Sequence, residues 1–284
     1  MRVLRVLAPN PGLMTLEGTN TWIVGDGPSI VIDPGPAIAS HLDEVERAAR
    51  GVAAILLTHD HPDHAEGAEA LAARTGAPLR AARPPAGGER LRDGAVVAAP
   101  GAEVVAVATP GHSADHVAFH LPAIGALFTG DAVLGRGTSV IDPPDGDLVA
   151  YLRSLRRMRE LAPRTIHPGH GPLVLRGVAK LDAYLAHRAE REAQVVAALR
   201  PGPTTPEAIV ASVYPDLAEE ARDLAARTVL AHLAKLEAEG LARREADGTF
   251  RAVAPRACER CGRPVRGRGR LCAACAVSSL QEPG

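Results

Sequence analysis

Apolar residues in the first 175 positions gather into short runs, each ending at a polar or glycine-containing loop. Short runs bounded by turn residues predict buried strands. Helical spacing of apolar residues falls between some of them, over 39–50, 64–75 and 146–161. Because helices alternate with strands, we expect a layered α/β structure with helices covering sheets. The predicted strands are TWIVG (21–25), SIVID (29–33), AAILLT (53–58), EVVAVAT (103–109), VAFHL (117–121), ALFTG (126–130) and RTIHPG (164–169).

The second half of the chain has a different pattern. A long helix with one apolar face is predicted over 177–199, and the segment RPGPTTP then interrupts it, because proline and glycine break helices. Thr205 and Pro206 are typical of the start of a further helix, and several more helices are predicted within residues 217–240. A hairpin turns at Asp247–Gly248. Helices followed by a two-stranded wing favour a winged helix; a helical appendage packed on the first domain is the alternative.

These patterns divide the chain into four parts. The first is the layered α/β domain, the second a connecting helix and linker, the third a winged-helix-like domain and the fourth a tail that contains all the cysteines. Their predicted bounds are 1–176, 177–202, 203–254 and 255–284.

Composition and charge restrict the class of protein. The chain has 284 residues, 46% of them hydrophobic, and a formal net charge of -1, so the whole chain has no electrostatic preference for a polyanion. No stretch approaches the roughly 20 apolar residues that cross a bilayer. The N-terminal apolar run is too short for a secretory signal. We therefore expect a cytoplasmic protein that does not bind membranes.

All four cysteines lie near the C-terminus, with the spacing C-x2-C-x10-C-x2-C. Two disulfides are one interpretation, but they suit small secreted proteins. In a cytosolic chain this spacing favours a zinc-ribbon-like knuckle with one structural Zn²⁺. The predicted ligands are Cys258, Cys261, Cys272 and Cys275.

The same tail is basic. Between Arg256 and Arg270 there are six arginines and one glutamate, a net charge of +5 before metal and thiolates are counted. Either this is a solvated run of charge, or it contacts phosphate groups.

The stretch LLTHDHPDHAEG (56–67) concentrates ionisable side chains directly after an apolar run. His59 and His61, two residues apart, can reach one metal ion, and Asp63 and His64 can reach a second beside it. Histidine and carboxylate are good ligands for metals such as zinc. An HxHxDH pattern after a strand therefore predicts a metal site.

Three later strands end at further candidate ligands. His112 follows in VATPGHSADH, Asp131 in LFTGDAV and His170 in IHPGHGP. Each candidate lies beside or close to glycine, which permits close approach of the backbone. The residues are sufficient for a centre of two metal ions.

The order HxHxDH, TPGHS, TGD and PGHG over roughly residues 10–175 resembles the metallo-β-lactamase superfamily of metal-dependent hydrolases. The resemblance implies an α+β chain whose first domain is a four-layer αββα sandwich with two metals at one edge. It implies Zn²⁺ or another divalent ion (manganese or iron) at both positions. It assigns His59, His61 and His112 to one metal, Asp63, His64 and His170 to the other, and Asp131 to both.

The resemblance also implies supporting residues and a mechanism. Asp33 in VIDPG matches a position behind the site and is expected to orient a ligand. His116 is expected beside the ligands rather than among them, with substrate contact or ligation as alternatives. A hydroxide shared by two metals would be the nucleophile, since metal binding lowers the pKa of water from 15.7 to about 7. Asp131 would hold the metal pair and Asp63 would orient the hydroxide. For His167, a place lining the site and a packed, hydrogen-bonded role are both open.

A narrower likeness concerns three further motifs: NPGLMTLEGTNTWIVG (10–25), LGRGTSVI (134–141) and YLAHRAEREAQV (184–195), followed by a winged helix. They resemble the LACTB2-type branch, which includes an endoribonuclease acting on single-stranded RNA. The cysteine tail is not part of that branch pattern.

Three functions remain open. The first is an endoribonuclease-like phosphodiesterase on single-stranded RNA. One Trp, three Tyr and three Phe offer few stacking rings for such a substrate. The second is a hydrolase of thioesters, resembling glyoxalase II, or of other small acyl compounds. The third is a nucleic-acid-binding module with a vestigial metal domain, which the complete set of candidate ligands disfavours.

Overall fold

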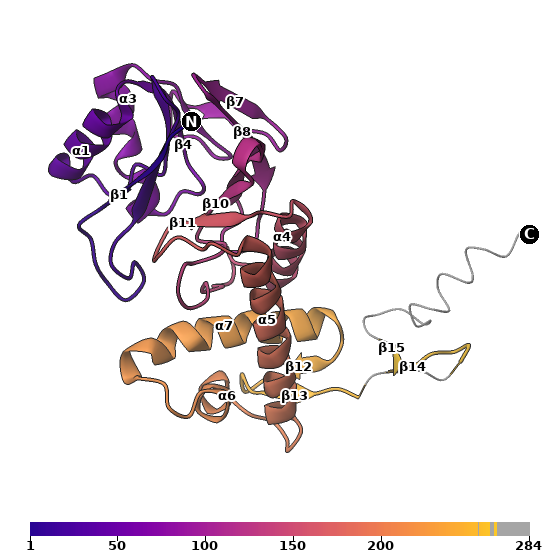
Figure 1. Ribbon diagram of the computed structural model, residues 1–284. Helices are drawn as coiled ribbons and strands as arrows, with labels where there is room; N and C mark the ends of the chain where they lie inside the picture. The colour runs from indigo at the N-terminus through magenta and orange to yellow at the C-terminus, as the bar shows by residue number, and fades with distance from the viewer. Residues whose placement is uncertain (255, 262–263, 266–284) are drawn as a thin grey trace, which may run out of the picture. The chain divides into compact units, whose positions relative to one another are not determined.

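The computed structural model describes residues 1–254, 256–261 and 264–265. The chain divides into two compact units, Met1–Ala186 and His187–Gly284. Figure 1 shows two sheets with flanking helices in the first unit and a mainly helical second unit. In the described part of the chain, no helix is both long and apolar enough to span a membrane.

The first sheet has six strands in chain order, β1-β2-β3-β4-β5-β6. The first three pair antiparallel and the last four pair parallel. The parallel part brings the C-terminal end of β4, where HxHxDH begins, beside the ends of its neighbours. The strands are β1 (Val3–Leu7), β2 (Asn20–Val24), β3 (Ser29–Ile32), β4 (Val52–Leu56), β5 (Leu79–Ala81) and β6 (Glu89–Arg90).

The second sheet has five strands in the order β11-β10-β9-β8-β7. Its pairs are antiparallel except β10 with β11, which run parallel. Two of its candidate ligands, Asp131 and His170, therefore emerge at the same edge. The strands are β7 (Val96–Ala99), β8 (Ala102–Ala108), β9 (Val117–Leu121), β10 (Ala126–Gly130) and β11 (Thr165–Pro168), with a short 3-10 helix, η1 (Pro122–Ile124), between β9 and β10.

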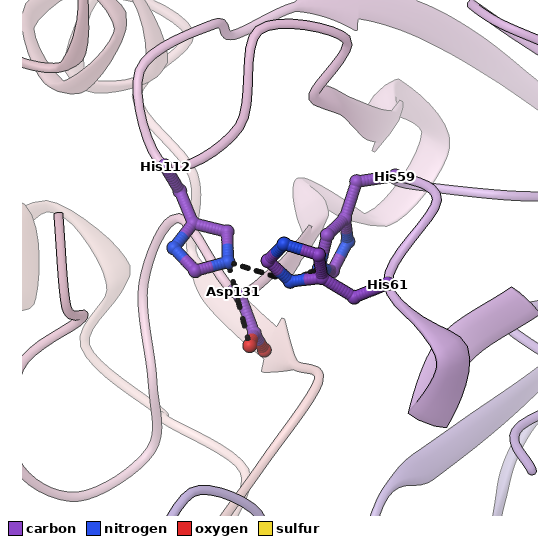
Figure 2. A group of neighbouring side chains, drawn as sticks. All are labelled: His59, His61, His112 and Asp131. Atoms are coloured by element: carbon purple, nitrogen blue, oxygen red, sulfur yellow. Dashed lines mark hydrogen bonds and ion pairs between the residues drawn. The ribbon is translucent and has the colours of Figure 1, made fainter. Parts of the chain in front are cut away.

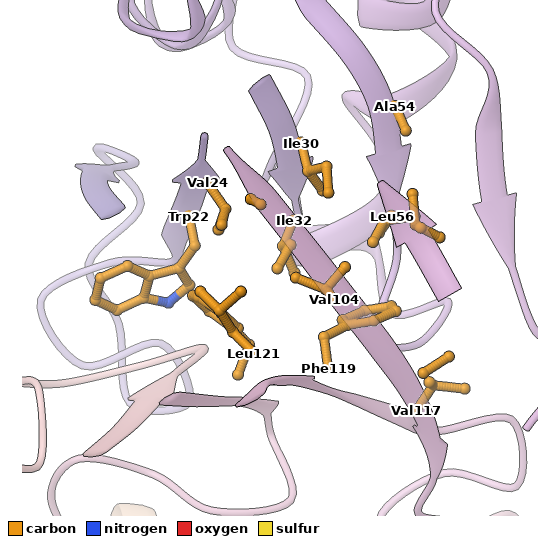
Figure 3. Close-up of a cluster of buried hydrophobic side chains, with 14 of the residues drawn as sticks. Trp22, Val24, Ile30, Ile32, Ala54, Leu56, Val104, Val117, Phe119 and Leu121 are labelled. Carbon is orange, nitrogen blue, oxygen red and sulfur yellow. The ribbon is translucent and has the colours of Figure 1, made fainter. Parts of the chain in front are cut away.

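The main core lies between the two sheets, where Ile30, Ile32 and Phe119 are buried in one cluster (Figure 3). Side chains alternate along a strand, so Val31 points to the other face of the first sheet. There it packs in a second cluster with residues of α1 (Ala39–Ala49) and α3 (Ala68–Thr75).

A helix associated with the second sheet completes the layers. α4 (Leu148–Glu160) begins where the Asp147 side chain accepts a hydrogen bond from the Ala150 N–H at 2.8 Å. Tyr151 on this helix donates to the carbonyl oxygen of Ala132 at 2.6 Å. Gly111 has φ +136°, and a Cβ there would lie 2.3 Å from the Tyr151 nitrogen, so the close approach requires glycine. The expected α+β fold is therefore present, with two packed sheets, α1 and α3 on the outer face of the first, and α4 bonded to segments that follow strands of the second.

The second unit has its own core. Val195, Leu233 and Phe250 are buried together, and the strands β12 and β13 pair antiparallel around the predicted turn. The unit contains the C-terminal part of α5 (Gly177–Leu199), then α6 (Pro206–Val213), α7 (Glu219–Ala238), β12 (Ala242–Arg244) and β13 (Phe250–Ala252). Helices followed by a wing confirm the predicted winged helix.

The cysteine tail is described only in part. β14 (Arg256–Ala257) pairs antiparallel with β15 (Pro264–Val265). Cys258 and Cys261 lie between these strands, whereas Cys272 and Cys275 lie outside the described residues. The zinc site of four cysteines stays a prediction.

Three sequence expectations differ from the structure. Six strands were not predicted: β1, β5, β6 and β7 lie at or near sheet edges with several side chains facing solvent, and β14 and β15 have two residues each. The helix expected over 64–75 is broken into α2 (Pro62–Ala65) and α3. The Gly67 N–H donates at 2.9 Å to the carbonyl oxygen of Gly35, which lies outside the helix, so the helical hydrogen-bond ladder is interrupted at this point. The helical segment before the hairpin is one helix, α7, rather than several.

His167 is packed and hydrogen-bonded. Its ring lies 4.5 Å from that of Trp22 and 4.7 Å from that of Phe128, centroid to centroid. Its Nε2 lies 3.2 Å from Thr165 Oγ1. Burial lowers the pKa of His167 from 6.5 to about 4.

This burial predicts a pH-dependent stability. Between pH 6.5 and about 4 the unfolded chain binds a proton that the folded chain rejects, so the free energy of unfolding falls as pH falls, by about 3 kcal/mol over that range from this group. Urea unfolding of the metal-free protein at several pH values measures this. His167→Phe should show a shallower decline than the wild type, and parallel curves for the two proteins would contradict the assignment.

Candidate metal centre

The candidate ligands stand at the ends of buried strands. His59 and His61 follow β4, and His61 is the N-cap residue of α2, whose first residue is Pro62. Proline is well suited to the first helical position, because its missing N–H would have no partner there. The resulting turn of helix carries Asp63 and His64 back toward the strand ends.

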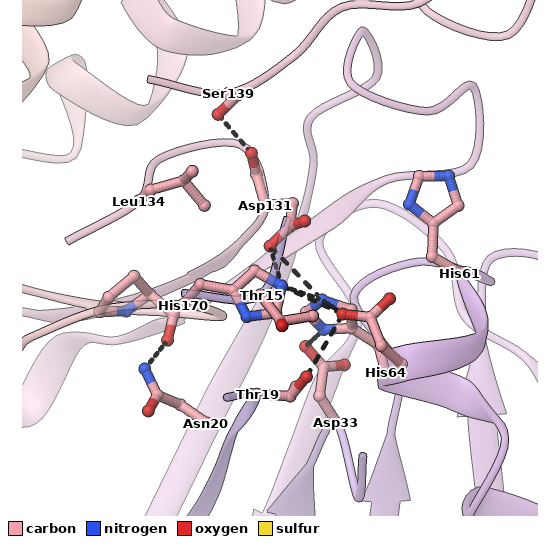
Figure 4. A network of polar contacts seen from close by, with 12 residues as sticks. Thr15, Thr19, Asn20, Asp33, His61, His64, Asp131, Leu134, Ser139 and His170 are labelled. Atoms are coloured by element: carbon pink, nitrogen blue, oxygen red, sulfur yellow. Dashed lines mark hydrogen bonds and ion pairs between the residues drawn. The ribbon is translucent and has the colours of Figure 1, made fainter. Parts of the chain in front are cut away.

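Loops after the second sheet supply the rest. His112 follows β8, Asp131 follows β10 and His170 follows β11. The structure brings all seven predicted ligands together in two groups, each with its potential ligand atoms within 4.8 Å of one another. Figure 2 shows the first group, and Figure 4 shows His64 and His170 of the second group with their surroundings. The first group is His59, His61, His112 and Asp131, and the second group is Asp63, His64 and His170.

Hydrogen bonds determine which imidazole nitrogen faces the centre. Nδ1 of His112 lies 2.9 Å from the carbonyl oxygen of Val140, and Nδ1 of His170 lies 3.2 Å from that of Gly18. A carbonyl oxygen only accepts, so each Nδ1 carries the proton. In both rings Nε2 is left to face the centre, which is the arrangement seen when a second partner orients a histidine ligand.

Asp33 orients two further ligands. Its carboxylate accepts hydrogen bonds from the Thr58 N–H at 2.8 Å, from the Thr58 hydroxyl at 2.7 Å and from His64 Nδ1 at 2.9 Å. Because the Thr58 hydroxyl donates to Asp33, its oxygen accepts from His59 Nδ1, 2.9 Å away. One buried carboxylate therefore orients His64 directly and His59 through Thr58.

His116 lies beside the centre but in neither group. Its Nδ1 lies 2.8 Å from Thr109 Oγ1, and its ring centroid is 5.2 Å from that of His59. It is 1% exposed. Burial has the largest effect on the pKa of His116 and lowers it well below 6.5. The neighbouring His112 lowers this pKa further, whereas the charge of Asp131 raises it. Its position matches a supporting role, and its function stays a prediction.

The nitrogens that face the centre lie unusually close together. His59 Nε2 is 2.9 Å from His61 Nδ1, and His64 Nε2 is 3.2 Å from His170 Nε2. Two neutral nitrogens with lone pairs at such a distance repel each other unless a proton or a metal ion lies between them. The donor set therefore fits divalent cations.

Asp131 joins the two groups. Its Oδ1 lies 3.3 Å from His170 Nε2 and 3.4 Å from His64 Nε2, and its Oδ2 lies 3.8 Å from His112 Nε2. Burial would raise its pKa, but His64 and His170 hold the pKa well below the usual value. The carboxylate is thus ionised and within reach of both groups.

When no metal is bound, protons on His64 and His170 balance the negative charge of the carboxylates. Burial lowers the pKa of His170, but Asp131 and Asp63 outweigh it and raise the pKa to about 9. His64 behaves similarly: burial opposes its charge, while Asp131 and Asp33 raise its pKa well above 6.5. A metal ion in the second group would replace these protons.

The sequence did not identify several supporting residues. The Thr19 hydroxyl lies 3.3 Å from Asp63 Oδ2, and Asn10 contacts Thr19 through both its amide nitrogen and its amide oxygen, at 3.0 and 2.9 Å (Figure 4 shows Thr19). Asn20 donates to the carbonyl oxygens of Pro168 and Gly171, at 2.9 Å each. These residues belong to the 10–25 motif, which the sequence linked only to a branch likeness.

The protonated state predicts proton release on metal binding. At pH 8 His170, with a pKa of about 9, holds a proton that a ligand must lose. Titration calorimetry with Zn²⁺ in two buffers of different ionisation enthalpy should report released protons, and apparent affinity should rise as pH approaches about 9. His170→Gln should release fewer protons at pH 8. Metal binding without proton release would contradict this account.

Comparison with known proteins agrees with this geometry. The model of the metallo-beta-lactamase superfamily matches residues 14–86 and 78–170, and that of the beta-lactamase associated winged helix domain matches residues 205–251. The "Beta-lactamase-like protein 2 homolog" of Drosophila melanogaster is 35% identical over 280 residues, covering 89% of this chain and 94% of the relative.

Solved structures share the fold. A metallo-beta-lactamase family protein of Thermus thermophilus aligns with a TM-score of 0.75 and 24% identity over 88% of this chain and 98% of the other. A protein called TTHA1623, crystallised in a di-iron-bound form, aligns with a TM-score of 0.51 and 28% identity over 62% of this chain and 96% of its own. The chain therefore belongs to the metallo-beta-lactamase superfamily of hydrolases, carries a C-terminal beta-lactamase associated winged helix domain, and resembles the beta-lactamase-like protein 2 homologues.

Proposed function

We propose that this hydrolase works with two divalent ions, one held by each group of ligands. The observation that carries the proposal is the Asp131 carboxylate, which reaches imidazole nitrogens of both groups at 3.3 to 3.8 Å. Ions held there would polarise the substrate and make water nucleophilic near neutral pH. The di-iron form of the 28% identical relative supports a dinuclear site. Zinc, manganese and iron are the candidate metals.

Asp63 is the residue we propose to act on the attacking water. Its side chain is 28% exposed, compared with 13% for Asp131, so it is the more accessible carboxylate of the two. Burial would raise its pKa, but the hydrogen bond from His170 and the charge of His64 lower it. An ionised carboxylate, fixed by Thr19, can accept a hydrogen bond from water and orient it toward a substrate.

The substrate we favour is a phosphodiester of single-stranded RNA. The support is the likeness to the branch that contains an endoribonuclease, together with the arginine-rich tail. The wing of the second unit adds little positive charge, because Arg243 and Arg251 both pair with Glu245, at 3.0 and 2.5 Å. We therefore place the phosphate contacts in the tail rather than in the wing.

A thioester or other small acyl compound is the second candidate. Leu13 and Met14 are 59% and 48% exposed. They lie on the same loop as Gly18 and Thr19, which contact His170 and Asp63. Exposed apolar side chains on a loop that contacts the centre would suit an acyl chain better than a sugar-phosphate backbone.

We propose that the tail binds one structural Zn²⁺ through its four cysteines. In support, Cys258 and Cys261 lie in the connection of a β-hairpin formed by β14 and β15. A C-x2-C pair in such a turn is a frequent half of a zinc site.

A direct comparison of substrates tests the proposed activity. We expect metal-loaded protein to cleave single-stranded RNA, and Asp63→Ala to lower the rate by about 10²–10⁴-fold, because an oriented carboxylate is lost. Gel analysis of RNA and a thiol-release assay with a glutathione thioester measure the two activities side by side.

The matched control is Asp60→Ala, since Asp60 lies in sequence between the ligands His59 and His61 but belongs to neither group of ligands. It should retain near-wild-type activity. Rapid thioester turnover without metal-dependent RNA cleavage would contradict the RNA proposal and support the acyl alternative. No metal-dependent hydrolysis of either substrate would contradict both.

A further inference from the structure

Two sequence motifs have no part in the proposed chemistry, yet they meet in the structure. The first is the loop 134–141, LGRGTSVI, and the second begins at Tyr184 on α5. The Tyr184 hydroxyl accepts a hydrogen bond from the Leu134 N–H at 2.8 Å and donates to the carbonyl oxygen of Gly137 at 3.1 Å. The Tyr184 side chain thus hydrogen-bonds to both ends of the turn 134–137, with which the loop begins.

The helix holds this turn firmly. Tyr184 is 2% exposed, so its hydroxyl bonds are shielded from water. One helical turn earlier, Lys180 donates from Nζ to the carbonyl oxygen of Gly135 at 3.2 Å. Gly137 has φ +71°, a left-handed conformation that the loop needs to turn at this point. Three backbone groups of the turn are therefore bound by two side chains of one helix.

The far end of the same loop reaches the first group of ligands. The carbonyl oxygen of Val140 accepts the hydrogen bond from His112 Nδ1 at 2.9 Å. The neighbouring Ser139 donates to the backbone oxygen of Asp131 at 2.5 Å and to that of Ala132 at 3.1 Å (Figure 4). The loop therefore orients the ring of His112 and hydrogen-bonds to the backbone of Asp131.

The second group has its orienting partners elsewhere. His64 is held by Asp33 and the ring of His170 by the carbonyl oxygen of Gly18. The loop does touch this group, since the Gly135 N–H donates to the backbone oxygen of His170 at 2.9 Å. That contact holds the backbone and leaves the orientation of the ring to Gly18.

We propose that Tyr184 is a positioning residue for the first metal site: it fixes the loop 134–141 so that Val140 orients His112, and it thereby sets the metal affinity of the first group more strongly than that of the second. This inference rests on the proposed metal-binding role of the two groups. Loss of a partner that orients a histidine ligand typically weakens metal binding about 10–100-fold.

The test measures each group alone. His170→Ala retains the whole first group, and His61→Ala retains the whole second group. Tyr184→Phe is then added to each background, and Zn²⁺ affinity is measured by competition with a chromophoric chelator. We expect Tyr184→Phe to weaken binding about 10–100-fold in the His170→Ala background and less than about threefold in the His61→Ala background.

Controls separate a positioning role from general damage. Tyr214→Phe removes another tyrosine hydroxyl, in the second unit, and should change neither affinity. Thermal unfolding verifies that each variant is folded. Lys180→Met removes the second tether of the same turn and should act in the same direction; it carries the test if Tyr184→Phe does not fold.

The outcomes distinguish this inference from the proposed function. Zn²⁺ binding in both backgrounds, with Tyr184→Phe affecting both equally or neither, would overturn the inference and leave the metal centre standing. If neither background nor the wild type bound Zn²⁺, the proposed centre itself would fail, and the role of Tyr184 with it.

Discussion

The structure depends on one electrostatic constraint: two buried imidazole nitrogens, His64 Nε2 and His170 Nε2, face each other at 3.2 Å. Hydrogen bonds to acceptor-only groups fix the outer nitrogen of His64, His112 and His170, so these rings cannot relieve the crowding by changing tautomer. Positive charge must therefore lie among them. Protons on the second group provide some of it without metal, and two divalent ions would provide it during catalysis.

The layered fold is what makes this crowding possible. The ligands follow the ends of strands, and alternate side chains of β4, β8 and β10 are buried between the two sheets, so the ligand backbones are anchored by a core centred on residues such as Ile32 and Phe119. The ligands are surrounded by groups that each hydrogen-bond to at least one histidine ligand. These groups are Asp33, Thr58 and the carbonyl groups of Gly18 and Val140. Such a layer holds donors in place before any metal arrives.

Much of this was predictable from the sequence, for physical reasons. The strands β4, β8, β10 and β11 are largely apolar runs with most of their side chains buried, and the ligands are polar residues that follow the ends of these runs. Edge strands such as β1 and β7 lack that pattern. The orienting partners of His112 and His170 are backbone carbonyls, and the residue types Val140 and Gly18 carry no sign of that role. For His167 the sequence left packing and a site role open, and only the rings of Trp22 and Phe128 beside it decide for packing.

The metal content of the purified chain tests the central claim most directly. The variant with serine at Cys258, Cys261, Cys272 and Cys275 confines the count to the His/Asp centre. Elemental analysis by mass spectrometry, with anomalous diffraction to locate the ions, should find two divalent ions per chain, one at each group of ligands. A chain that holds one ion or none after equilibration with excess Zn²⁺, Mn²⁺ or Fe²⁺ would contradict the dinuclear account.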